Sequence, residues 1–152
     1  MKKNLSDYVK HYKSFIQEDV CDKTIIELNK LNNNLWNKHE FYNPKKEIAI
    51  KISGEQELST LSSKEISTKE IIMGEVWKAI YKYINDLKFS WFDGWKTHSG
   101  IRFNKYSENT KMAEHCDHIQ SLFEGREKGI PILSILGILN DDYEGGKFIM
   151  FE

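Results

Sequence analysis

The pair His115 and Asp117 is the part of this 152-residue sequence whose residue types and spacing best fit a chemical role. In a β-strand, residues two apart point to the same side, so the imidazole and the carboxylate would converge while Cys116 points the other way. One nitrogen and one oxygen ligand on a strand supply two corners of a 2-His-1-carboxylate metal site, which leaves positions open for reactants. We therefore predict a metal site with His115 and Asp117 as ligands.

The motif is not specific by itself. A His-x-Asp pair arises by chance on the order of once in four sequences of this composition, and such a pair is often only a structural hydrogen bond. Three further motifs surround it in a fixed order. A strand-like segment at 102–106 precedes it, an apolar run ending in Leu139-Asn140 follows it, and the turn Glu144-Gly145-Gly146 comes last. Four motifs in order discriminate far better than one.

In this order the motifs resemble the prolyl 4-hydroxylase-like group of iron(II)/2-oxoglutarate oxygenases. The resemblance is strong over residues 101–151 and weaker over residues 15–28. It implies a double-stranded β-helix (a jelly roll, cupin-like) with buttressing helices and the metal at one mouth. It also implies an oxidoreductase that uses Fe(II), with 2-oxoglutarate and O₂ as co-substrates, and it admits ascorbate as an auxiliary reductant.

Tyr106 occupies the position from which a tyrosine commonly reaches the distal carboxylate of 2-oxoglutarate in this group. A phenol O–H suits that role because it can donate one charge-assisted hydrogen bond. The alternative is an ordinary strand tyrosine with its hydroxyl at the surface. The spacing from Tyr106 to His115 favours the cofactor role. The Glu144-Gly145-Gly146 turn is expected to be structural, since paired glycines allow positive φ and close backbone approach.

The sequence departs from the family in its C-terminal part. The family's second histidine and its basic anchor for 2-oxoglutarate follow the Glu-Gly-Gly turn, whereas this sequence has no histidine after His118 and only Lys147 as a basic residue after that turn. Three earlier histidines, His11, His39 and His98, match no family position. The sequence also stops within an apolar run. We therefore expect a C-terminally incomplete member of the family that lacks its last strands.

Two other functions stay open. The chain could be a non-catalytic jelly-roll binding module, or a cupin-type metalloenzyme that holds another metal, such as Zn or Mn, on His115 and Asp117. The substrate is also open, because loops around the mouth set specificity in this fold. Those loops are expected at 40–64 and 121–129. A peptide or protein side chain is one candidate substrate, beside an amino acid, a sugar or a nucleobase.

Helices are predicted mainly in the first part of the chain and strands mainly in the second, and these elements would position the site residues. We predict a strand over 8–16, a helix from Asp19 to about Leu31, a loop over 51–64, and a helix over 67–88 that begins with a capping box at 67–70. Strands are predicted over 99–106, 112–118, 130–139 and 147–151. The fold class is therefore α+β, or all-β with buttressing helices, in one domain over 1–152, with support at 1–95 and metal-binding strands at 99–152.

Composition narrows the class of protein. The net charge is −1 and charged residues make up 30% of the chain, so a basic surface for nucleic acid is not expected. No apolar run follows the basic N-terminus or approaches the length of a membrane span, and the two cysteines are too few for a small secreted domain. These features favour a cytoplasmic protein without membrane partners.

Overall fold

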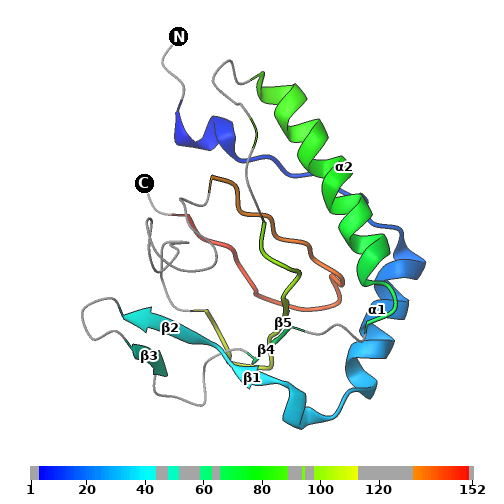
Figure 1. The fold of residues 1–152 in the computed structure, drawn as a ribbon, viewed down its shortest axis with the longest axis vertical. Helices are drawn as coiled ribbons and strands as arrows, with labels where there is room; N and C mark the ends of the chain where they lie inside the picture. The colour runs from blue at the N-terminus through cyan, green and yellow to red at the C-terminus, as the bar shows by residue number, and fades with distance from the viewer. Residues whose placement is uncertain are drawn as a thin grey trace. The chain divides into compact units, whose positions relative to one another are not determined.

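A computed structural model of the chain describes residues 4–43, 48–51, 59–62, 66–88, 94, 98–112 and 132–150 (Figure 1). These residues form two α-helices and five short strands, and every strand pair is antiparallel. Within the described ranges, no helix is long and apolar enough to cross a membrane. The jelly roll and the single domain over 1–152 stay predictions.

The chain divides into two compact units. The first, here called the helical unit, comprises Met1–Lys30, Lys64–Lys96 and Gly137–Glu152. The second, the sheet unit, comprises Leu31–Ser63 and Thr97–Leu136. Each unit has its own buried side chains, which are Cys21, Thr24, Leu28, Ile66, Thr68, Ile72, Ile80 and Leu87 in the helical unit, and His39, Leu61 and Phe103 in the sheet unit.

Helix α1 spans Glu18–Lys30, which confirms the predicted helix within one residue at each end. Its acidic first turn and basic last residue, Lys30, complement the helix dipole. Cys21, Thr24 and Leu28 are buried, at steps of three and four residues. That spacing produces one buried stripe along the helix.

Helix α2 spans Lys69–Leu87 and confirms the second predicted helix. The predicted capping box at its start is wrong, because the N-cap residue Thr68 makes no side-chain hydrogen bond to the helix. The Thr68 hydroxyl instead lies 2.5 Å from the hydroxyl of Thr24 in α1. Since the single proton of Thr24 goes to the Val20 carbonyl at 2.6 Å, Thr68 is the donor of this pair.

Glu27 of α1 supplies the cap that α2 lacks. Its carboxylate accepts the backbone N–H of Ser67 at 2.7 Å and also the Ser67 hydroxyl. These bonds lower the pKa of Glu27, with the Ser67 hydroxyl as the largest cause. A carboxylate at a helix N-terminus satisfies donors that the helix leaves open. The start of α2 is therefore stabilised by α1 rather than by its own side chains.

The predicted strand over 8–16 is wrong. The chain forms a short 3-10 helix, η1, at Leu5–Tyr8 and then runs without helix or strand to the start of α1. Ser14 in this run has a φ of 52°, which is incompatible with a regular strand. This run contacts α2 through two hydrogen bonds, from the Tyr12 hydroxyl to Asp86 and from the Tyr83 hydroxyl to the Tyr8 carbonyl.

The sheet unit contains a three-stranded antiparallel sheet in the order β1-β4-β5. Its strands are β1 at Asn37–Lys38, β4 at Ser59–Leu61 and β5 at Phe103–Lys105. The central strand β4 lies within the stretch predicted as a loop, so that prediction is wrong for 59–61. Leu61 pairs with Phe103, and both side chains are buried.

A second, two-stranded sheet is the hairpin of β2 at Glu40–Asn43 and β3 at Ile48–Lys51. Its register pairs Phe41 with Ile50 and Tyr42 with Ala49. These residues were expected within a substrate loop at 40–64, and the hairpin was not predicted. Two short runs of aromatic and β-branched residues separated by a few residues are typical of hairpins, so the sequence did contain a pattern that predicts one.

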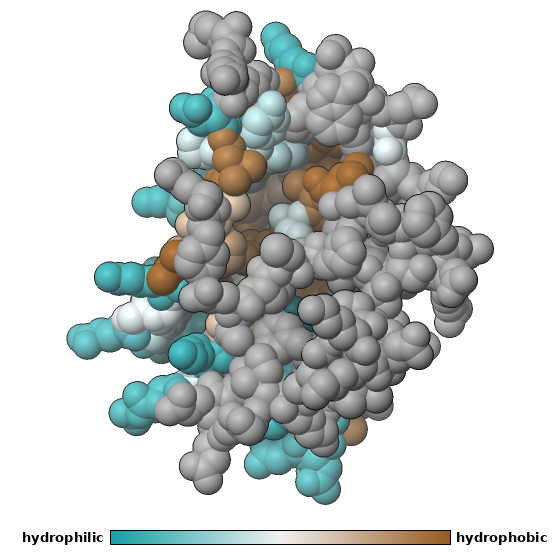
Figure 2. Space-filling model, turned by 90° about the vertical axis from the view of Figure 1, so that its left-hand side faces the viewer, coloured by the Kyte–Doolittle hydropathy of each residue, from teal (hydrophilic) through white to brown (hydrophobic). Residues whose placement is uncertain are grey.

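The predicted strands over 130–139 and 147–151 are absent from the described residues 132–150. Apolar side chains of this segment lie at the surface, and hydrophobic side chains are visible on the face drawn in Figure 2. The most exposed of them are Leu136, Ile138, Phe148 and Ile149. A strand exists only through pairing with another strand, so an apolar run without a partner is not one.

Candidate functional site

Strand β5 lies within the first of the four motifs, at 102–106. Phe103 points to the buried face, and Lys105 shares that face, with its Nζ 5.5 Å from the centroid of the Trp36 ring. Asn104 points to the opposite face, together with its cross-strand neighbours Thr60 and Asn37. The strand thus separates an apolar face from a polar face.

Asn104 is the residue that sequence reasoning missed. Its side-chain Oδ1 is buried and has no hydrogen-bond partner among the described residues. An unsatisfied buried acceptor costs about 1–3 kcal/mol, so it is more common at functional or strained positions than in an ordinary core. The signal that could have found it is the period of two, which places Asn104 on the same side as Tyr106.

Tyr106 follows β5 directly, and its side chain is 55% exposed. Continuing the strand alternation by one residue at each end places Arg102 and Tyr106 on the side of Asn104. Arg102 is also exposed. An exposed phenol is accessible to a small-molecule carboxylate, and it is equally compatible with a surface tyrosine, so both roles weighed for Tyr106 stay open.

A four-residue turn follows Tyr106 and matches the predicted strand boundary. The Ser107 carbonyl accepts the backbone N–H of Thr110 at 3.0 Å, and the Thr110 hydroxyl accepts the backbone N–H of Ser107 at 2.8 Å. Asn109 has a φ of 59°, a left-handed conformation that asparagine tolerates better than most residues. The turn is thus set by local residue chemistry and fixes the connection that precedes His115.

His115 and Asp117, the predicted metal ligands, lie outside the described residues, so their convergence stays a prediction. Within the residues that the structure describes, no group of three or more His, Cys, Asp and Glu side chains could hold a metal ion.

The earlier histidines lie in unlike environments. His39 is buried next to β1, whereas His11 and His98 are exposed. The Nδ1 of His98 lies 2.9 Å from the carbonyl oxygen of the adjacent Ser99. That contact helps to orient the His98 ring through the backbone of the next residue.

The turn at Glu144-Gly145-Gly146 has the conformation expected for it. Gly145 has a φ of 86° and Gly146 a φ of 60°, which confirms the positive φ predicted for the paired glycines. A β-carbon at Gly146 would lie 2.7 Å from Cε2 of Tyr143, so the tyrosine ring packs directly on this glycine. The structural role expected for the turn stays a prediction.

No protein-family model, curated protein or solved structure matches this chain.

Proposed function

We propose that this chain is an iron(II)- and 2-oxoglutarate-dependent dioxygenase, a hydroxylase of the prolyl 4-hydroxylase-like group, or a fragment of one. The observation that carries the proposal is the ordered set of motifs at 102–106, His115-x-Asp117, Leu139-Asn140 and Glu144-Gly145-Gly146. Each motif alone is weak. Their order and spacing together support the family more than any one residue does.

Two features of the described residues support this proposal. The first is the strand β5 with the buried acceptor of Asn104 on the side that the alternation assigns to Tyr106. The second is the glycine turn at 145–146, with positive φ at both residues. Both agree with the family pattern of a polar strand face and a tight turn. They are also compatible with a jelly roll that has lost its chemistry.

The donor chemistry fits the implied metal in part. One imidazole and one carboxylate suit Fe(II), which, when bound, would supply the oxidising chemistry with O₂ and 2-oxoglutarate. His115 and Asp117 would hold the metal, and Tyr106 would donate a hydrogen bond to the distal carboxylate of 2-oxoglutarate. The sequence has no histidine after His118. Two protein ligands hold iron weakly, so we expect low affinity and slow turnover.

The compartment proposed is the cytoplasm, where thiols stay reduced. Cys21 is a free thiol buried in α1, and burial is the largest cause that raises its pKa. A raised pKa keeps the sulfur as an unreactive thiol, which suits a structural role. The proposed substrate is a peptide or protein side chain reached through the loops at 40–64 and 121–129.

An anaerobic titration tests the metal site. Fe(II) and 2-oxoglutarate added together should produce a weak visible absorption band in the wild-type chain. The variants His115→Ala and Asp117→Ala should lose this band, and His98→Ala, at an exposed histidine, should keep it. Tyr106→Phe should weaken 2-oxoglutarate binding about tenfold, as expected for loss of one charge-assisted hydrogen bond.

The alternatives predict other results in the same titration. No band and no metal binding would favour the non-catalytic module. Binding of Zn or Mn that depends on His115 and Asp117, without any effect of 2-oxoglutarate, would favour the cupin-type metalloenzyme. A band that survives His115→Ala would refute the assignment of His115.

A further inference from the structure

The segment before α1, here called the N-terminal strap (residues 4–17), is attached to α2 through side chains. Among the described residues, no backbone–backbone hydrogen bond joins residues 10–16 to another part of the helical unit. Two tyrosine hydroxyls make the connection instead. Tyr83 of α2 donates to the carbonyl of Tyr8 at 2.7 Å, and Tyr12 of the strap donates to the carboxylate of Asp86 at 3.0 Å.

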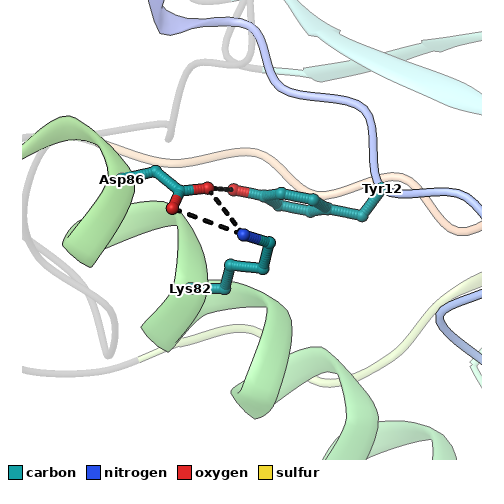
Figure 3. Close-up of polar contacts among 3 residues, drawn as sticks. All are labelled: Tyr12, Lys82 and Asp86. Atoms are coloured by element: carbon teal, nitrogen blue, oxygen red, sulfur yellow. Dashed lines mark hydrogen bonds and ion pairs between the residues drawn. The ribbon is translucent and has the colours of Figure 1, made fainter.

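Tyr12, Lys82 and Asp86 form a closed triangle of contacts (Figure 3). The Nζ of Lys82 donates to both carboxylate oxygens of Asp86, at 3.1 and 3.3 Å. The same Nζ lies 5.3 Å from the centroid of the Tyr12 ring, within the range of a cation–π contact. Each side chain therefore touches the other two, so loss of one weakens the contacts of both partners.

The electrostatics favour the closed triangle at neutral pH. The pKa of Tyr12 is raised to about 12, first by burial and then by the hydrogen bond to Asp86, so the phenol stays a donor. The pKa of Asp86 is lowered, first by Lys82 and then by Tyr12, with Lys10 of the strap adding to the effect. A protonated phenol and an ionised carboxylate are the forms that this hydrogen bond needs.

The strap also contacts the segment that carries the glycine turn. A β-carbon at Gly137 would lie 3.9 Å from Cδ1 of Ile16, an ordinary van der Waals distance, so the two residues are neighbours. The strap thus joins α2 through Tyr12 and Tyr83, and joins the 137–150 segment through Ile16.

We propose that the N-terminal strap opens and closes on α2 as one unit, with Tyr12, Lys82 and Asp86 as a cooperative latch, and that opening releases the 137–150 segment from the helical unit. The strap has few backbone tethers and many exposed residues, which are the features of a segment that opens without global unfolding. The contacts among Tyr12, Lys82 and Asp86 set how often the strap opens.

Hydrogen exchange measured by mass spectrometry on the full chain tests this device. The variants Tyr12→Phe, Lys82→Met and Asp86→Ala should each raise the exchange rate of amides at 5–16 about tenfold, with a smaller rise at 137–140. The double variant Tyr12→Phe with Asp86→Ala should exchange no faster than the faster single variant, because the contacts act together. Exchange within α1 and α2 should stay unchanged.

Tyr81→Phe is the matched control, since Tyr81 is a tyrosine of the same helix with a side chain that is 73% exposed. It should leave the strap at the wild-type rate. Equal exchange at 5–16 in the wild type and in Tyr12→Phe would overturn the latch. An equal rise in the exchange rates of α1, α2 and the strap would show that the strap does not open separately, and would overturn the proposal.

Discussion

The helical unit and the sheet unit differ in how their elements are held. In the helical unit, α2 runs for 19 residues and is joined to α1 and to the strap by hydroxyl and carboxylate side chains. In the sheet unit, β1 has two residues and β5 has three, and the buried pair Leu61 and Phe103 holds the centre. A helix satisfies its backbone hydrogen bonds internally, whereas a strand depends on distant partners. Substitutions that remove packing contacts in the sheet unit should therefore lower the free energy of unfolding more than substitutions that remove polar contacts in the helical unit.

The largest effect is expected from Phe103→Ala. Phe103 is 6% exposed and faces Leu61 across β4 and β5, so the variant removes one side chain of this buried apolar pair. The free energy of unfolding should fall by about 3–5 kcal/mol, measured by urea denaturation. Tyr106→Ala, at an exposed aromatic residue nearby, should change it by less than about 0.5 kcal/mol. A loss below about 1 kcal/mol for Phe103→Ala would mean that this pair is not the centre of the unit.

The hydroxyl pair Thr24 and Thr68 should give the next largest effect. Thr24→Val leaves the buried Thr68 hydroxyl without its acceptor, so it should cost about 1–3 kcal/mol of unfolding free energy. Thr68→Val should cost less, because the Thr24 hydroxyl keeps its hydrogen bond to the Val20 carbonyl. The double variant replaces both hydroxyls with methyl groups of similar shape and should cost less than the sum of the singles. Strict additivity in this double-mutant cycle would contradict the direct hydrogen bond.

Lys88→Gly should stabilise the helical unit slightly. Lys88 ends α2 with a φ of 48°, a left-handed conformation in which glycine has no β-carbon penalty. We expect a gain of about 0.5–1 kcal/mol in thermal or urea unfolding. The matched change Lys78→Gly, in the interior of the same helix, should instead lose about 1 kcal/mol. A loss at Lys88 would show that the helix does not end there.

The smallest effect is expected in the pH dependence of stability that comes from Glu27. Because the pKa of Glu27 is lowered in the folded chain, its contribution is present above its ordinary value near 4.5 and is lost as the pH falls through the folded value. Glu27→Gln should therefore lower the melting temperature at neutral pH and leave it nearly unchanged at a pH below the folded pKa of Glu27, which flattens the acid limb of a plot of melting temperature against pH. Glu108→Gln, in an exposed turn, is the control and should keep the wild-type slope. An unchanged acid limb in Glu27→Gln would rule out the capping role.

Prediction from sequence succeeded where the structure depends on near neighbours in the chain. The helices over Glu18–Lys30 and Lys69–Leu87, the turn at 107–110 and the positive φ of Gly145 and Gly146 were all foreseen. It failed where a residue had a choice of distant partners. The run at 8–16 was expected to form a strand and instead reaches α2 through the Tyr12 hydroxyl, and β4 formed inside an expected loop.

The candidate site divides in the same way. The roles assigned to His115 and Asp117 came from residue types and spacing, and that of Tyr106 from the family resemblance, and these roles stay predictions. The buried acceptor of Asn104 could not be found from residue type, because asparagine is usually a surface residue. The burial of its Oδ1 appears only in the folded chain, where Asn104 pairs with Thr60 across β5 and β4.

The sequence by itself determined the two helices, the turn chemistry and the order of the motifs, because these depend on periodicity, φ preferences and side chains a few residues apart. Only the tertiary structure decided that Glu27 and Thr24 of α1 meet the start of α2, and that the strap is held by Tyr12 and Asp86. A hydrogen bond between residues far apart in the chain forms only after other contacts have brought the two groups together. No local pattern encodes which of several suitable partners will be the nearest.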